Sequence, residues 1–391
     1  MSGIPQRSAA AELRAAGALA VLRLVHEHPG VSRAEVARAL TLRTGSASEI
    51  VGRLRDRRLL AEVAPGDTGR RGRPSGLLVP HPNGPVVFAA EIAHAGWRAM
   101  AVELGGHPIA ERRGRRARDP LQALREIRRA LGDLHGLVGN RCAAVAVSVA
   151  GTVVGERLVE AATLRWRDLD LARVIPGSLG DVPFVAGNDA TLAGLAEARR
   201  GVAAGVPVVV YLSVEVGIGG VLLVGGRPLL GALGEAGEFG HMPFGDPALR
   251  CPCGARGCWD LEVDGRALAR ALGRRTPADP RRFAERTLAA ARSGASLEQS
   301  AVDGVAYALG RGTGAVVNAL DPSLVVVGAL AADMLALAPA KLRAGYEAAL
   351  MRHRRADPPA VVPGAVTGAS LVGAAEAAFD AILTPELLLD A

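Results

Sequence analysis

The chain has 391 residues, of which 49% are hydrophobic and 22% charged, a composition typical of a soluble globular protein with two or three domains. Its first ten residues lack the apolar core of a secretory signal and no run of about 18 apolar residues predicts a membrane span, so we expect a cytoplasmic protein. The net charge of +7 is concentrated in residues 1–80, where 13 Arg oppose 7 Asp and Glu, and this indicates a nucleic-acid-binding module, with a solvated basic face as the alternative.

Residues 1–80 have the pattern of a winged helix-turn-helix. Apolar residues spaced by three and four predict a helix over residues 11–28, which ends at a Pro-Gly pair. Ser32 and Glu35 have the spacing of a capping box, so a second, short helix is expected to begin there. A third helix is predicted over residues 44–58. The two apolar segments that follow it flank a tip rich in glycine and arginine, as in a β-hairpin wing.

The start of the third helix and the wing tip carry side chains suited to DNA. The N-terminal end of a recognition helix enters the major groove, where hydroxyls reach phosphates or bases, Arg binds guanine and Glu accepts from cytosine. Arginines on a wing contact phosphates or enter the minor groove. A module of three short helices that binds another protein is the alternative. The candidate DNA-contacting residues are Ser32, Arg33, Arg43, Thr44, Ser46, Ser48, Glu49, Arg53, Arg71 and Arg73.

A break at residues 81–85 separates this segment from a body in which strands and helices alternate. Two successive rounds of strands and helices predict a two-lobed α/β body. We interpret the arginine-rich run at residues 111–119 as a solvated turn, and Cys142 as a buried strand residue. The predicted strands cover residues 86–93, 97–104, 143–151, 183–189, 206–214, 217–229 and 323–330, and the predicted helices cover 121–138, 191–201 and 371–383.

Three of the four cysteines lie within eight residues, at Cys251, Cys253 and Cys258, and His241 precedes them by ten residues. Clustered cysteines in a reducing cytoplasm indicate a metal site rather than disulfides. Three thiolates and one imidazole complete a tetrahedral Zn2+ shell with no open position for water, so the zinc is expected to be structural. A chance cluster of three free thiols is the alternative.

The sequence GEFGH at residues 237–241, followed by CPCGARGCWD at 251–260, resembles the signature of the ROK family of repressors and sugar kinases. The wing end RGRP at residues 71–74 is similar to that of the family's repressor branch. The resemblance implies an actin-like, hexokinase-type fold of the ribonuclease H-like class. It would have a small lobe over residues 81–190, a large lobe over 191–391 and a sugar cleft between them.

The resemblance also implies a set of sugar ligands. Asn188 and Asp189 match the pair that contacts the sugar, and this Asp is the general base in kinase members. Glu238 matches a further ligand contact, and His241 would join the metal to the sugar cleft. Asp260 stands where the family usually has the longer Glu. A helix cap is an alternative or additional role for the Asn188-Asp189 pair.

Three stretches that bind nucleotide in family kinases depart from the family pattern. Residues 91–96 lack the paired glycines and the Thr of the first phosphate loop, so their side chains would obstruct a phosphate. Residues 215–220 begin with Glu215 instead of Gly, and a carboxylate there would repel phosphate. The adenosine-side turn reads Val-Gly-Ala at residues 327–329 where Gly-Gly is usual. We therefore expect that the chain is not an enzyme.

Together these features predict a transcriptional repressor of sugar-metabolism or transport genes. Its affinity for a palindromic double-stranded DNA operator would change when a sugar or sugar derivative binds. A single winged helix on a palindromic site implies a homodimer or homotetramer. Two alternatives stay open: an active ATP-dependent sugar kinase, supported by the intact Asp189, and a ROK repressor controlled by a protein partner rather than a sugar.

Overall fold

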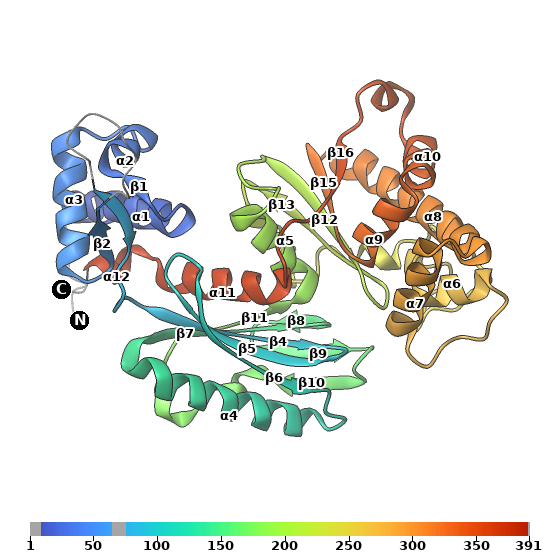
Figure 1. The fold of residues 1–391 in the computed structure, drawn as a ribbon, viewed down its shortest axis with the longest axis horizontal. Coiled ribbons are helices and arrows are strands. Elements are labelled where there is room, and N and C mark those ends of the chain that lie inside the picture. The colour runs from blue at the N-terminus through green and yellow to red at the C-terminus, as the bar shows by residue number, and fades with distance from the viewer. Residues whose placement is uncertain (1–8, 65–75, 390–391) are drawn as a thin grey trace, which may run out of the picture. The chain divides into compact units, whose positions relative to one another are not determined.

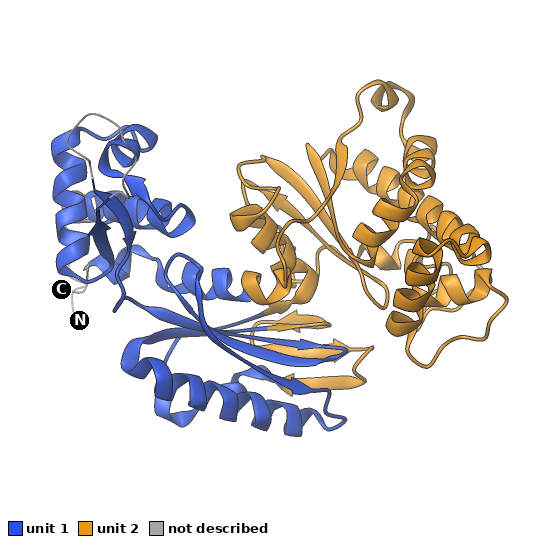
Figure 2. Ribbon diagram, in the orientation of Figure 1, with its two compact units in different colours: residues 1–147, 170–186, 374–391 blue, residues 148–169, 187–373 orange. Residues whose placement is uncertain are grey.

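The computed structural model describes residues 9–64 and 76–389 (Figure 1). The chain divides into two compact units, of which unit 1 comprises residues 1–147, 170–186 and 374–391, and unit 2 comprises residues 148–169 and 187–373 (Figure 2). The division differs from the lobe boundary expected at residue 190. The C-terminal residues return to unit 1, and residues 148–169 group with unit 2.

The N-terminal part of unit 1 is a winged helix. Its helices bury Val21, Val36 and Leu54 completely or nearly so, and its strands form an antiparallel sheet in the order β1-β3-β2. The predicted capping box is present: the Ser32 N–H donates to Glu35 Oε2 at 2.7 Å, and the Glu35 N–H donates to Ser32 Oγ at 3.3 Å. The elements are α1 (Ala9–Glu27), β1 (Val31–Ser32), α2 (Arg33–Ala39), α3 (Thr44–Asp56), β2 (Leu60–Val63) and β3 (Leu77–Pro80).

A five-stranded sheet in the order β6-β5-β4-β7-β11 follows, and the last residues of β7 and β11 group with unit 2. The amphipathic helix α4 turns seven apolar side chains inward, and Asp119 caps its first turn. The sheet and the helices next to it in the chain are β4 (Val86–Ala93), β5 (Gly96–Glu103), β6 (Pro108–Arg115), α4 (Pro120–Val138), η1 (Gly139–Arg141), β7 (Cys142–Val149), η2 (Leu171–Val174), η3 (Gly177–Leu179) and β11 (Phe184–Asn188).

The expected solvated turn at residues 111–119 is wrong for most of its length, because β6 continues to Arg115 and pairs with β5. The strand lies at the edge of its sheet and its side chains alternate between exposed and half-buried. Charged side chains on an edge strand keep it from pairing with another chain, so an edge strand of this kind resembles a loop in composition. Cys142 is the first residue of β7, so it is a strand residue as predicted, but it is half-buried rather than buried.

Unit 2 contains a five-stranded sheet in the order β14-β13-β12-β15-β16 and a small sheet in the order β10-β9-β8. Strand β12 pairs antiparallel with β13 and parallel with β15, which in turn pairs parallel with β16. The strands are β8 (Thr152–Val154), β9 (Arg157–Ala161), β10 (Trp166–Asp170), β12 (Val208–Val214), β13 (Ile218–Val224), β14 (Arg227–Pro228), β15 (Leu324–Ala329) and β16 (Ala360–Pro363). The helices, with those that close the chain, are α5 (Asp189–Arg200), η4 (Phe239–His241), η5 (Trp259–Glu262), α6 (Gly265–Ala271), α7 (Pro280–Arg292), α8 (Ser296–Leu320), α9 (Leu330–Leu337), α10 (Pro339–Ala349), η6 (Arg352–Ala356), α11 (Ala369–Ile382) and α12 (Pro385–Leu389).

The two large sheets repeat one strand order. Numbered along the chain, the strands of each sheet lie in the order 3-2-1-4-5. In each case helices separate the third strand from the fourth, and a helix follows the fifth: α5 follows β11, and α11 follows β16. Two rounds of the same topology are what the alternating sequence pattern predicted, and they form the actin-like, two-lobed body.

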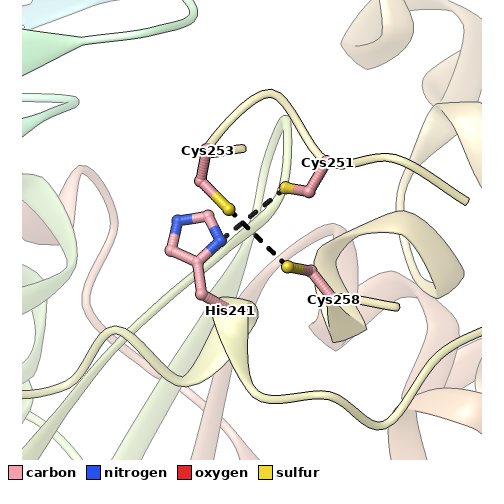
Figure 3. A group of neighbouring side chains, drawn as sticks. All are labelled: His241, Cys251, Cys253 and Cys258. Atoms are coloured by element: carbon pink, nitrogen blue, oxygen red, sulfur yellow. Dashed lines mark hydrogen bonds between the residues drawn. The ribbon is translucent and has the colours of Figure 1, made fainter. Parts of the chain in front are cut away.

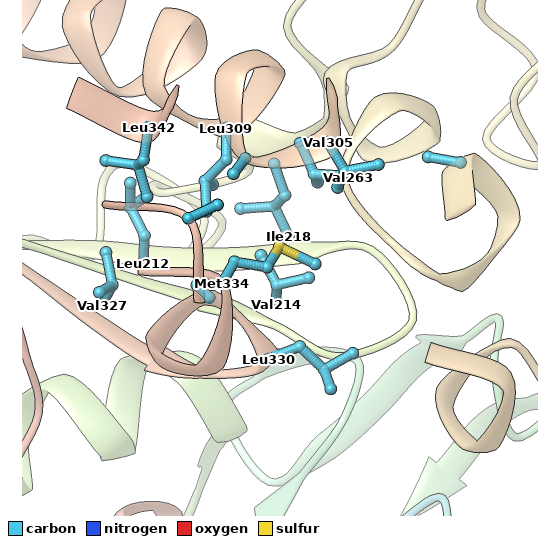
Figure 4. Close-up of a cluster of buried hydrophobic side chains, with 14 of the residues drawn as sticks. Leu212, Val214, Ile218, Val263, Val305, Leu309, Val327, Leu330, Met334 and Leu342 are labelled. Carbon is cyan, nitrogen blue, oxygen red and sulfur yellow. The ribbon is translucent and has the colours of Figure 1, made fainter. Parts of the chain in front are cut away.

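The largest core of unit 2 lies between its sheet and the helices α6 to α10 (Figure 4). Trp259 is 1% exposed, and its indole N–H donates to the Ala308 carbonyl oxygen at 3.1 Å, so the polar atom of this large ring is paired. Gly310 and Gly345 allow α8 and α10 to approach closely, because a Cβ at either position would overlap backbone atoms of the other helix. This core anchors the segment that follows β14.

Candidate effector site and metal centre

The metal cluster comes from a loop that folds back on itself between η4 and η5. The Gly254 N–H donates to the Cys251 carbonyl oxygen at 3.0 Å, and the Cys251 N–H donates to the Ala255 carbonyl oxygen at 2.9 Å. Gly254 and Gly257 have φ values of +96° and +69°, a backbone conformation that favours glycine. The two tight turns place three thiols on one side of the loop.

His241 and the three thiols converge on one point (Figure 3), and their ligand atoms all lie within 4.8 Å of one another. Cys253 Sγ is 3.7 Å from Cys258 Sγ, and Cys251 Sγ is 3.8 Å from His241 Nδ1. A tetrahedral zinc ion with Zn–S bonds of about 2.3 Å has S–S edges of about 3.8 Å. The four predicted residues therefore have the chemistry and the spacing that a metal ion requires.

Two of the three thiols have a raised pKa, while the pKa of Cys253 is lowered. Burial raises the pKa of Cys251, and burial together with the neighbouring thiols raises the pKa of Cys258 to about 12. A metal ion binds the thiolate, so binding has to release these protons. Cys258 is fully buried, which makes an uncompensated thiolate costly there.

Asp260 connects the metal segment to the turn between β12 and β13. Its Oδ1 accepts from the Ile218 N–H at 2.6 Å, and its Oδ2 lies 3.8 Å from His241 Nδ1. Gly217, with φ +109°, leaves room for this carboxylate, because a Cβ there would lie 2.9 Å from Oδ2. Burial raises the pKa of Asp260, while the Ile218 N–H lowers it. One oxygen of this expected sugar ligand is therefore directed at the backbone of its own chain.

Asn188 begins α5 and is its N-cap. Its Oδ1 accepts from the N–H groups of Ala190 and Thr191, at 2.9 and 3.1 Å, and its Nδ2 donates to the Gly151 carbonyl oxygen at 3.0 Å. The alternative role as a helix cap is therefore confirmed for Asn188. Asp189 follows at the first position of the helix, and its Oδ1 accepts from the Ala190 N–H at 2.9 Å.

Two glycines of β13 allow the start of α5 and the metal segment to pack closely against this strand, because neither has a Cβ. A Cβ at Gly219 would lie 2.6 Å from the Ala190 Cβ, and one at Gly220 would lie 2.6 Å from the Phe239 ring. Glu238 directly precedes Phe239, is half-exposed, and has Oε2 at 3.8 Å from His241 Nε2. Unit 2 thus gathers around one strand the predicted effector residues Asn188, Asp189, Glu238, His241 and Asp260.

The stretches that bind nucleotide in kinases carry their own internal contacts here. Glu215 forms an ion pair with Arg281 at the start of α7, and Arg281 also donates to Glu285 at 3.0 Å. Ala329 has φ +52° and ψ −134°, a conformation that costs a residue with a Cβ free energy. Sequence reasoning missed Arg281, which carries no local signal because its partner is distant in the chain.

The predicted DNA-contacting residues divide into three groups. Of the predicted residues on α3 and at its N-cap, Ser48 is half-buried and the others are exposed. The opposite face of the helix is buried, at Ala47, Ile50, Val51 and Leu54. Two others make internal contacts: Ser32 Oγ donates to Glu35 Oε2 at 2.8 Å, and Arg33 forms an ion pair with Glu62 on β2. Arg71 and Arg73 lie outside the described residues. The exposed set is Arg43, Thr44, Ser46, Glu49 and Arg53.

Residues 97–380 match the ROK family. The protein belongs to this family. It is 32% identical over 261 residues to a glucokinase of Streptomyces coelicolor, covering 62% of this chain and 81% of that one. It is 26% identical over 339 residues to a putative xylose repressor of Caldicellulosiruptor sp., covering 81% and 83%.

A crystal structure of a ROK family transcriptional regulator, described as a homologue of the E. coli MLC protein, matches 97% of this chain and 98% of its own. The TM-score is 0.77 at 20% identity, so the likeness concerns the fold, and it includes the N-terminal winged helix of this ROK chain. No helix in residues 9–64 or 76–389 has the length and apolar character needed to cross a membrane.

Proposed function

We propose that this ROK protein is a DNA-binding transcriptional repressor whose affinity for its operator is controlled by a sugar or sugar derivative. One observation carries the proposal: a winged helix with an exposed polar face on α3 stands in the same chain as a ROK body that keeps its sugar-side residues. Its regulated genes would serve sugar metabolism or transport. Zinc at the cluster of one histidine and three cysteines is structural, since the cluster supplies four protein ligands.

The DNA-binding step rests on the start of α3. Arg43, Thr44 and Ser46 are exposed at the N-terminal end of a helix whose other face is buried in the winged helix. Short hydroxyl side chains and an arginine at this end suit base edges and phosphates in the major groove. We infer a palindromic operator bound by a homodimer or homotetramer, because the winged helix of each subunit suits one half-site, and we place the complex in the cytoplasm.

The effector step rests on the residues around β13. The carboxylates of Asp189 and Glu238 are suited to pairs of neighbouring hydroxyl groups, and a metal-bound His241 would be held rigidly beside them. A ligand changes operator affinity only through different affinities for the states of the protein. The Glu215–Arg281 ion pair and the altered loops support the loss of phosphoryl transfer.

The test measures binding of the zinc-loaded full-length protein to the promoter DNA of its own gene, with and without a panel of hexoses, pentoses, N-acetylated sugars and their phosphates. Arg43→Ala should weaken specific binding about tenfold or more, because a bidentate contact with a base contributes about 1–3 kcal/mol. Arg343→Ala is the matched control, since Arg343 is exposed on α10. The absence of any specific complex at about 0.15 M salt would overturn the proposal.

A second candidate, an ATP-dependent sugar kinase, is favoured by Asp189 and by the 32% identity to a glucokinase. It predicts steady ADP release with ATP, Mg2+ and one sugar of the same panel, and loss of this activity in Asp189→Asn. The third candidate is a repressor that a protein partner controls. A specific DNA complex that no sugar affects would select it over the sugar-controlled repressor.

A further inference from the structure

Helix α11 belongs to both compact units. Its residues 369–373 group with unit 2 and its residues 374–382 with unit 1, although it is one continuous helix. Gly373 contacts α5 within unit 2, and Glu376 contacts α1 within unit 1.

In unit 2, α11 lies directly on the helix that begins at the proposed effector site. A Cβ at Gly373 would overlap the carbonyl oxygen of Leu192 on α5, so the two helix backbones are in contact there. Leu192 is in the first turn of α5, whose N-cap is Asn188. A change at Asn188 and Asp189 that moves the first turn of α5 therefore acts on α11 without any intervening side chain.

In unit 1, α11 is fixed to α1 of the winged helix by a buried polar pair. His26 Nε2 lies 3.0 Å from Glu376 Oε2, and the two residues are only 3% and 4% exposed. The Gly105 N–H donates to His26 Nδ1 at 2.9 Å, so Nδ1 is the acceptor nitrogen and Nε2 carries the proton donated to Glu376. Breaking this pair would leave buried polar groups unsatisfied, which makes it a strong constraint on the position of α1.

Further contacts join the winged helix to the C-terminal segment. The ring of Phe379 is 4.6 Å from that of His26, and Arg23 of α1 donates to the Leu383 carbonyl oxygen at 2.8 Å. Arg57, just after α3, donates to the Leu387 carbonyl oxygen at 3.2 Å. Helix α3, which carries the exposed polar face, is thus also connected to the C-terminal segment through its C-cap residue Arg57.

We propose that α11 transmits the state of the effector site to the winged helix, with Glu376 as the positioning residue that fixes α1 to it. Gly373 and Glu376 are three residues apart, about 4.5 Å along the helix axis, so a helix of this length transmits a displacement rather than absorbing it. The inference rests on the proposed function and names the route of its regulation. No local sequence signal marks His26 or Glu376, because the pair forms only in the folded chain.

The first experiment needs no ligand. Hydrogen–deuterium exchange is measured on the zinc-loaded full-length protein and on Glu376→Gln, with Glu347→Gln of α10 as the matched control. We expect exchange to be at least about threefold faster in α1 and also in α5 of Glu376→Gln, and unchanged in the control. Faster exchange in α1 alone, or in neither helix, would overturn the proposal.

A second variant tests the other end of α11 and decides the question even where Glu376→Gln unfolds the winged helix. Gly373→Ala should alter exchange in α1, whereas Gly132→Ala, where a Cβ meets no atom within 4 Å, should not. If α1 exchanges at the wild-type rate in Gly373→Ala, α11 does not connect the two parts.

Regulation is tested with D-glucose and D-xylose as probes on the operator complex. For wild-type protein we expect one of them to change the operator Kd within the usual range for coupled sites, about 5- to 150-fold, and for Glu376→Gln we expect a change below about twofold with an unaltered sugar Kd. An equal response in both proteins would overturn the role of Glu376. A wild-type protein that binds no operator, or no sugar of the full panel, would contradict the proposed function, while the exchange measurements would still decide the coupling.

Discussion

The sugar side and the nucleotide side of the ROK body differ in how their residues are used. On the sugar side, Asn188 caps α5 and Asp260 accepts from the Ile218 N–H, so the expected ligand residues also stabilise the local fold. On the nucleotide side, Glu215 is paired with Arg281 and Ala329 keeps a backbone conformation suited to glycine. The expected sugar-side residues are thus held by hydrogen bonds of the fold itself, whereas Glu215 is held by one partly exposed ion pair.

Under the proposed function, this difference gives a physical reason why one half of a kinase-like site would be kept without the other. Phosphate binding needs free backbone N–H groups and small side chains, so replacing a loop glycine with the partly exposed Glu215 removes it at little cost in stability. The sugar-side residues sit beside the metal cluster and the start of α5, where a substitution disturbs buried hydrogen bonds. Four substitutions or removals test this contrast in stability.

The largest effect is expected from the metal centre. Cys258→Ser should abolish zinc binding and lower the free energy of unfolding by about 4 kcal/mol at free zinc a thousandfold above its Kd, because the metal binds only the folded loop. Zinc content by elemental analysis and urea unfolding measure both consequences. Cys142→Ser is the matched control, since Cys142 lies on β7 of unit 1 and is not among the four residues of the cluster. Full zinc content in Cys258→Ser would mean that the four residues do not form the site.

The next effect concerns Asp260. Asp260→Ala removes the acceptor of the buried Ile218 N–H and should cost about 1–3 kcal/mol of stability. Asp260→Asn keeps an oxygen at this position and should cost less. Unfolding by urea compares the two variants, and equal losses in both would indicate that the negative charge beside His241, rather than the hydrogen bond, is what stabilises the segment.

Local signals carried most of what the sequence revealed. The capping box at Ser32, the spacing of the cysteines and the apolar periodicity of α4 each depend on residues close together in the chain. They predicted the winged helix, the metal cluster and the repeated α/β topology.

The contacts that sequence reasoning missed are all long-range. Nothing near Arg281 indicates Glu215, and nothing near Glu376 indicates His26, because such pairs depend on packing between distant elements. The arginines of residues 111–119 concealed an edge strand because the solvent-facing side chains of such a strand have the composition of a loop. The C-terminal return to unit 1 likewise leaves no trace in periodicity.

A smaller effect of opposite sign is expected at Ala329. Ala329→Gly should raise the free energy of unfolding by about 1 kcal/mol, because glycine adopts φ +52° and ψ −134° without the steric cost of a Cβ. Ala344→Gly, in the exposed part of α10, should instead lower it by about 1 kcal/mol, the usual cost of glycine within a helix. Thermal and urea unfolding measure both, and a loss of stability in Ala329→Gly would contradict the interpretation of this turn as a former Gly-Gly position.

The smallest effect on stability is expected from Glu215→Gln. The Glu215 and Arg281 side chains are 42% and 29% exposed, so solvent screens their ion pair and its loss should change the free energy of unfolding by about 0.5 kcal/mol or less. Arg281 keeps Glu285 as a partner. Glu347→Gln, which breaks the exposed pair with Arg343, should have a similarly small effect.

ATP binding by isothermal titration calorimetry separates two explanations of the altered nucleotide side. Since residues 91–96 and Ala329 also depart from the kinase pattern, we expect no ATP binding in Glu215→Gln. A variant that binds ATP would show that a single ion pair closes the nucleotide side, and the contrast with the sugar side would then depend on one residue rather than on three separate stretches of the chain.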